Sequence, residues 1–155
     1  MINYEDVVFA FAQHGDKLPR EGISKVLKVG LPGLHIILRV LDEEERPSIR
    51  RWAIECIGSY QDVRSADILR KFSRSDYMTE RLHTVIAIRN NNRLDMLDIL
   101  EELALTDSSG GVRVNALSAI LKLDASKAKS IAEQMTSDEK SYIRVAANKI
   151  INSSK

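Results

Sequence analysis

Hydrophobic residues recur along this chain at steps of three and four, the spacing that places them on one face of an α-helix. The pattern predicts a first set of helices over residues 34–41, 66–73, 97–104 and 128–135. It predicts a second set over residues 48–57, 79–88, 111–120 and 142–151. Segments rich in Ser, Asp and Gly separate the two sets and predict turns. No segment shows sustained alternation of hydrophobic and polar residues, so we expect an all-α protein without β-sheet.

The four predicted helices of the second set share one pattern, with an arginine third, a small residue sixth and an isoleucine tenth. The arginines stand 31 or 32 residues apart: Arg50, Arg81, Arg113 and Arg144. An acidic residue precedes each of them at the same period: Glu45, Asp76, Asp107 and Asp138. The first set repeats an isoleucine in phase with these: Ile37, Ile68, Ile99 and Ile131. A fixed period of this size predicts a solenoid of stacked helical hairpins.

The repeats account for residues 33–152, as about four hairpins, and residues 1–30 lack their pattern. Pro19 stands where the period would place an arginine before Arg50. Two further amphipathic segments in this region predict a divergent helical pair that caps the stack, as terminal repeats often do. We therefore expect one domain over residues 1–155, with about ten helices.

The arginine and acid ladders are interpreted as structural. An arginine on the flank of one helix can reach an acidic residue at the neighbouring turn, and its remaining donors can satisfy carbonyls at helix ends. One such contact in each repeat would link consecutive repeats. The alternative, a row of cations for an anionic ligand, is weakened because each arginine has an acidic residue nearby.

The sequence of acidic residue, short turn, Val/Ile-Arg-x-x-Ala and aliphatic tail resembles the HEAT and HEAT-like repeat family. Within residues 33–152 the second repeat departs from the pattern, because Glu80 replaces an aliphatic residue and Thr84 replaces the small alanine. The resemblance implies a right-handed α-solenoid whose arginine-bearing helices line an inner, concave surface. The two departures predict looser packing or a local bend in that repeat.

Residues that vary between repeats are the candidates for binding. At 100° per residue, three columns of positions fall opposite the predicted core face of the arginine-bearing helices. The apolar members are Leu82, Ile86, Val114 and Leu121, and the polar members of the tentative site are Arg51, Glu55, Arg89, Ser118 and Lys149. An apolar centre with a charged rim is typical of protein-binding grooves. Two alternatives remain open: the superhelix could cover these positions, or the helical phase could be wrong by one residue.

Trp52 and His83 occupy equivalent positions on the flank of successive helices, and we include both in the tentative site. As the only tryptophan, Trp52 could anchor a partner, since tryptophan is enriched at interface hot spots. It could equally pack against the cap, and the sequence favours packing.

Composition narrows the classes of function. Of the 155 residues 44% are hydrophobic and 29% charged, with a net charge of +1. A globular protein is therefore expected, and the near-neutral charge makes nucleic-acid binding an unlikely role because phosphate binding usually needs basic excess. The chain has neither a basic leader segment nor an apolar run of membrane-spanning length, and its single cysteine, Cys56, excludes an internal disulfide. These features predict a cytoplasmic protein without membrane contact.

No catalytic, metal-binding or cofactor-binding pattern is found. The histidines are isolated, a Cys56–His83 dyad would join residues out of phase, and the SSGG segment at 108–111 lacks the lysine of a phosphate-binding loop. We expect a non-enzymatic module that binds another protein: an adaptor, a regulator or a toxin-immunity protein. The family resemblance also leaves open a bilin-lyase-type subunit and, less favoured by the charge balance, a HEAT-like DNA-binding protein or glycosylase.

Overall fold

The computed structural model describes residues 1–153, and helices are the regular secondary structure found over that range. Two helices cover the N-terminal part: α1 (Tyr4–Phe11) and α2 (Lys17–Lys28). The first predicted set becomes α3 (Leu31–Glu43), α5 (Val63–Phe72), α7 (Leu97–Thr106) and α9 (Ala125–Gln134). The second set becomes α4 (Pro47–Ile57), α6 (Met78–Asn90), α8 (Gly110–Leu123) and α10 (Ser141–Ser153). A short 3-10 turn, η1 (Leu94–Met96), precedes α7. The predicted all-α class and the number of helices are confirmed.

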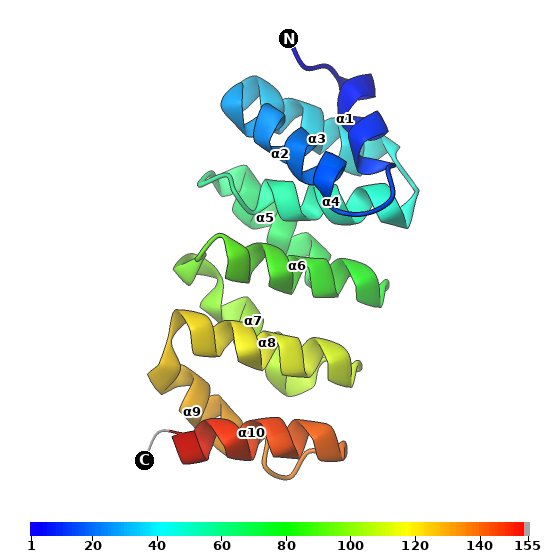
Figure 1. Ribbon diagram of the computed structural model, residues 1–155. Helices are drawn as coiled ribbons and strands as arrows, with labels where there is room; N and C mark the ends of the chain where they lie inside the picture. Colours follow the sequence, from blue (N-terminus) through cyan, green and yellow to red (C-terminus); the bar gives the residue numbers. More distant parts are fainter. Residues whose placement is uncertain (154–155) are drawn as a thin grey trace.

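The helices form a stack of hairpins (Figure 1). Helices α4, α6, α8 and α10, here called the front helices, lie one beneath another and run in the same direction. Each packs on its neighbours, α4 on α6, α6 on α8 and α8 on α10, and each also packs on the helix that precedes it in the chain. Those preceding helices, α3, α5, α7 and α9, are here called the back helices. The front helices therefore have one side turned away from the back helices.

Local sequence explains where several helices begin. Pro47 occupies the first turn of α4, as predicted, where its missing N–H is not needed. Asn3 and Asp6 form a capping box at the start of α1. Asp62 and Asp124 accept hydrogen bonds from backbone N–H groups at the starts of α5 and α9.

The constant apolar residues of the repeats form the core. Ile57, Ile88 and Ile120 are fully buried, and the equivalent residue of the last repeat, Ile151, is partly exposed. The small residues at the sixth position, Ala53, Thr84, Ala116 and Ala147, are all fully buried. Thr84 is accommodated because its hydroxyl donates a hydrogen bond of 2.9 Å to the Glu80 carbonyl oxygen of the preceding turn. This bond satisfies its polar atom inside the core.

Helices α1 and α2 pack on α3 and α4 at the N-terminal end of the stack (Figure 1). Phe11 of α1 and Val26 of α2 are fully buried. Gly22 of α2 is also buried and allows α1 to approach closely, since an added Cβ would lie only 2.9 Å from that of Ala10. The pair thus covers the first repeat. Within residues 1–153 the structure contains no helix that is long and apolar enough to span a membrane.

Candidate functional site

The ladder arginines link consecutive repeats in the central part of the stack. Arg81 of α6 donates from Nε and Nη2 to the carboxylate of Asp107 at 2.7 and 3.0 Å. Arg113 of α8 makes the same bidentate contact with Asp138, at 2.9 and 2.9 Å. Each arginine therefore binds the acidic residue of the following repeat. The Nη1 of each donates back to a carbonyl at its own turn, from Arg81 to Ser75 and from Arg113 to Asp107.

The first member of the arginine ladder uses a different acid. Arg50 donates from Nε to Glu80 at 2.7 Å, and its Nη1 binds the carbonyls of Leu41 and Glu44. The predicted partner position in the next repeat, Asp76, is exposed and forms no ion pair among residues 1–153, and the same holds for Glu45. The interpretation of these two acids as linking residues is therefore wrong. Glu80, which replaces an aliphatic residue, is buried and supplies the missing carboxylate.

The ion pairs shift the acidity of their members in the expected directions. Hydrogen bonding from Arg113 lowers the pKa of Asp138, and the Asp138 contact raises the pKa of Arg113. The hydrogen bond to Asp107 likewise raises the pKa of Arg81. Both arginines stay charged at any physiological pH, and their charges are already compensated. These two ladder arginines are therefore committed to the fold and are not free to bind a ligand.

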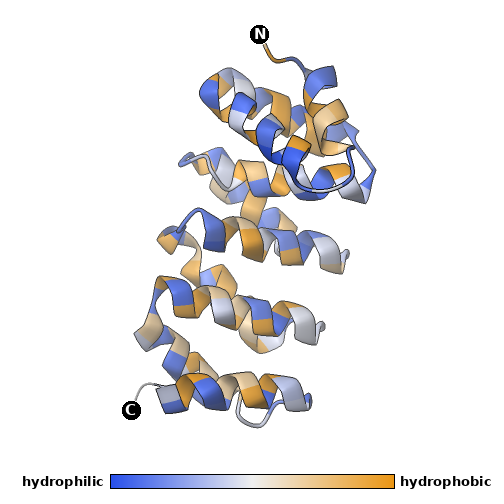
Figure 2. Ribbon diagram, viewed as in Figure 1, coloured by the Kyte–Doolittle hydropathy of each residue, from blue (hydrophilic) through white to orange (hydrophobic). Residues whose placement is uncertain are grey.

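The side of the front helices turned away from the back helices exposes apolar side chains. Leu82, Ile86 and Val114 are partly exposed, Leu121 is 40% exposed and Val145 is 68% exposed. On α6 these positions lie opposite the buried Thr84 and Ile88. We call this set the front strip: Leu82, Ile86, Val114, Leu121 and Val145. Hydrophobic segments are visible in the middle of α6 and α8 (Figure 2). The predicted helical phase thus leaves these five residues accessible.

Trp52 does not belong to this surface, and its assignment to the binding site is corrected. The side chain is only 4% exposed. Arg20 of α2 lies 5.6 Å and Arg51 lies 5.0 Å from its ring centroid. The ring is therefore covered by the N-terminal helices and by its own neighbour. Gly58, directly after α4, is buried too and packs on Ala87 of α6.

The polar residues assigned to the site border the front strip in different ways. His83 Nδ1 and Glu55 Oε1 lie 2.7 Å apart and join α6 to α4, so this pair is partly used in packing. Ser118 and Lys149 are exposed, and no contact of the Lys149 ammonium group is found within residues 1–153. Arg89 is half-buried, and its Nε contacts only the neighbouring Asn90 side chain, at 3.3 Å. The rim therefore contains unpaired cations together with one carboxylate, Glu55, that is hydrogen-bonded to His83.

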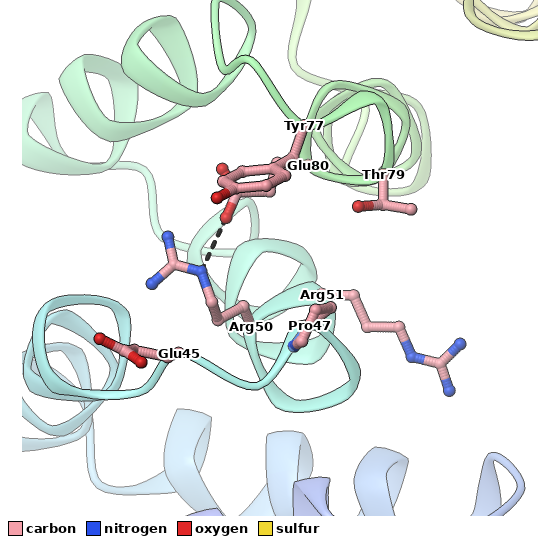
Figure 3. A pocket seen from close by; sticks show the side chains of 7 residues that line it. All are labelled: Glu45, Pro47, Arg50, Arg51, Tyr77, Thr79 and Glu80. Atoms are coloured by element: carbon pink, nitrogen blue, oxygen red, sulfur yellow. Dashed lines mark hydrogen bonds and ion pairs between the residues drawn. The ribbon is translucent and has the colours of Figure 1, made fainter.

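A cleft of about 430 Å³ lies at one end of the rim, between the first turns of α4 and α6 (Figure 3). Its walls are formed by Glu45, Pro47, Arg50, Arg51, Tyr77, Thr79 and Glu80. The Arg50–Glu80 ion pair crosses it, whereas the Arg51 side chain points away from that pair. The Nε of Arg51 is buried without a hydrogen-bond partner in the described part of the chain.

The other reactive side chains are placed for structural roles. Cys56 is fully buried, and desolvation raises its pKa to about 12, so the thiol remains protonated near neutral pH. His83 is hydrogen-bonded to Glu55, which gives it a different partner from the Cys56 considered above. Across residues 1–153 no group of three or more His, Cys, Asp or Glu side chains is arranged to hold a metal ion.

Arg93 is a linking residue that the sequence did not reveal. It is 2% exposed and donates to the carbonyls of Tyr60 and Gly58 and to the hydroxyl of Ser65. Its remaining donors bind Asp95 at 2.8 and 2.7 Å. The residue thus ties the turn after α6 to the turn after α4. It occurs once, outside the repeated ladders, so no period marks it.

Comparison with known proteins adds no relative: no protein-family model matches the chain, and no curated protein sequence matches it. The site is therefore described by its own geometry alone.

Proposed function

We propose that the chain is a non-enzymatic protein-binding module that recognises its partner through the front strip. In this proposal it belongs with the HEAT-like repeat proteins, and its hairpins form a right-handed solenoid with the front strip on the concave side. An adaptor, a regulator and a toxin-immunity protein all use such a module, and a cytoplasmic setting is part of the proposal.

One observation carries this proposal: side chains that vary between the repeats leave apolar atoms exposed on one side of three successive front helices. Leu82 and Val114 also pack on the core, but contact with solvent does not explain why apolar residues occupy these partly exposed positions and that of Ile86. An apolar centre bordered by charged groups matches the composition of protein interfaces, in which the buried core is depleted of charge and the rim is polar. The constant residues, by contrast, are used in the core and in the inter-repeat ion pairs.

The proposal is tested by affinity capture from native lysate with the intact chain as bait. The variant Leu82→Glu plus Ile86→Glu places two charges in the centre of the front strip. Both side chains are partly exposed but Leu82 also packs on the core, so far-UV circular dichroism must first show that the variant is folded. We expect the variant to lose the proteins that the unchanged chain captures.

A control places the same two charges on apolar residues elsewhere that are more exposed than Leu82 and Ile86. Val63 and Leu94 are 73% and 59% exposed and lie outside the front strip, beside the turns that follow α4 and α6. The variant Val63→Glu plus Leu94→Glu should retain every captured protein. If the folded Leu82→Glu plus Ile86→Glu variant also retains them all, the front strip is not the binding surface.

A further inference from the structure

Unpaired arginines of this protein gather beside the front strip. Most arginines within residues 1–153 form an ion pair with a carboxylate. Those that form none are Arg51, Arg89 and Arg144. Arg144 uses its Nη1 on two carbonyls at the start of α10. Arg51 and Arg89 both border the front strip, so charge compensation is missing where a partner would bind.

Two further cations lie on this side of the molecule. Lys149 and Lys122 are exposed on α10 and α8, and Lys122 contacts only a carbonyl oxygen, that of Arg89, at 3.0 Å. Two carboxylates also lie here: Glu55, which is hydrogen-bonded to His83, and the exposed Glu45 in the wall of the cleft, so the cations outnumber them. The rim is therefore basic although the whole chain has a net charge of only +1. A surface of this kind favours an acidic partner, because opposite charges steer association and like charges oppose it.

The spacing of the apolar positions indicates the shape of the partner. Leu82, Val114 and Val145 occupy equivalent positions on α6, α8 and α10, and Arg51 occupies the same position on α4. Axes of packed helices lie about 8–10 Å apart. An α-helix advances about 10.5 Å in seven residues, so one laid across the front helices would meet one of these positions every two turns. Crossing all four front helices would need about 20 residues.

From this arrangement we infer that the front strip accepts an acidic amphipathic α-helix of a partner protein, laid across the front helices. Its apolar side chains, seven residues apart, pack on Leu82, Val114 and Val145. Its carboxylates lie beside Arg51, Arg89 and Lys149. The inference rests on the proposed function, since it specifies what the front strip binds. An apolar centre between the cations favours a protein over a nucleic acid, whose contacts are mainly to phosphates.

The test uses two synthetic helical peptides of about 20 residues, identical in their leucines at seven-residue spacing. One carries Glu at the flanking positions and the other carries Lys. Fluorescence anisotropy with the intact protein should show at least about tenfold tighter binding of the Glu peptide, falling as salt is raised from about 50 to 500 mM. Equal affinities, tighter binding of the Lys peptide, or no binding of either peptide would overturn the inference.

Two charge-reversal variants make the test specific. Arg89→Glu plus Lys149→Glu should weaken binding of the Glu peptide about tenfold or more. Arg39→Glu plus Arg74→Glu, which changes the net charge equally on α3 and in the turn after α5, should leave it within about twofold. Equal loss in both variants would contradict a local effect and overturn the inference. Binding of duplex DNA in preference to the Glu peptide, with a steep salt dependence, would do the same.

This result is separable from the proposed function. If native partners are lost with Leu82→Glu plus Ile86→Glu while the two peptides bind equally, the front strip binds proteins and the acidic helix is wrong. If the Glu peptide binds selectively but native partners survive that variant, the peptide surface is not the one used by those partners, and the proposed function fails instead.

Discussion

Replacement of Arg113 by alanine tests how strongly one inter-repeat contact stabilises the stack. Arg113 donates two hydrogen bonds to Asp138 and one of 2.7 Å to the Asp107 carbonyl, and the Arg113 and Asp138 side chains are 9% and 12% exposed. Removing one partner of a fully buried pair costs about 3–5 kcal/mol. Asp138 keeps the backbone N–H of Lys140 and some contact with water, which reduces that cost. We expect Arg113→Ala to lower the free energy of unfolding by about 1–3 kcal/mol.

The measurement is urea unfolding followed by circular dichroism, with Arg74→Ala as the control. Arg74, in the turn after α5, pairs with Glu102 of α7, but these side chains are 72% and 51% exposed. Such pairs contribute little, so the control should remain within about 0.5 kcal/mol of the unchanged protein. If Arg113→Ala were no more destabilising than Arg74→Ala, the linking role of the ladder arginines would be refuted.

The same contact predicts a pH dependence. Arg113 holds the pKa of Asp138 below its usual value, chiefly through the side-chain hydrogen bond. A carboxyl whose pKa is lower in the folded than in the unfolded chain stabilises the fold above the unfolded value of about 3.9 and loses that contribution as pH falls through the folded value. The difference in stability between the unchanged protein and Arg113→Ala should therefore shrink between about pH 6 and pH 3. A difference that stays constant over this range would contradict the ion pair.

Three further substitutions or reactions probe the packing. Gly58→Ala should lower the free energy of unfolding in urea by about 1–3 kcal/mol, because the new Cβ would lie 2.8 Å from that of Ala87. An unchanged unfolding midpoint would show that α4 and α6 can move apart to accept it. Arg93→Met should destabilise by about 2–4 kcal/mol in the same assay, since the Tyr60 carbonyl and the Ser65 hydroxyl lose a buried donor; a loss below about 0.5 kcal/mol would show that water replaces it. Cys56, whose pKa burial raises to about 12, should react with a thiol reagent at pH 8 only after unfolding, and rapid reaction of the native protein would contradict its burial.

The repeat period made the helices predictable. Apolar ladders recur in phase, and each predicted segment coincides with a helix of the structure, although 66–73 and 128–135 extend one residue past α5 and α9. The exposed positions of the front strip also followed from helical phase, because 100° per residue fixes which residues lie opposite the core. The positions of the helices and their exposed faces both follow from periodicity, which can be seen in a single sequence.

Features that occur once were not predictable in the same way. Glu80 reads as a departure from the repeat, and its partner, Arg50, becomes evident only when α4 and α6 are placed side by side. Trp52 is buried because α2 covers its flank of α4, and residues 1–30 carry no repeat from which that position could be inferred. Arg93 lies in a turn, where its contacts depend on the distance between two loops far apart in the sequence.

The affinity of a purified native partner for the folded variants tests the central claim most directly. The partner would be one recovered by capture, and its dissociation constant would be measured for the unchanged protein, for Leu82→Glu plus Ile86→Glu, and for Val63→Glu plus Leu94→Glu. The front strip as binding surface predicts about 100-fold or greater weakening for the first variant, which is about 2.7 kcal/mol, and less than about threefold for the second. Equal affinities for both variants would contradict it.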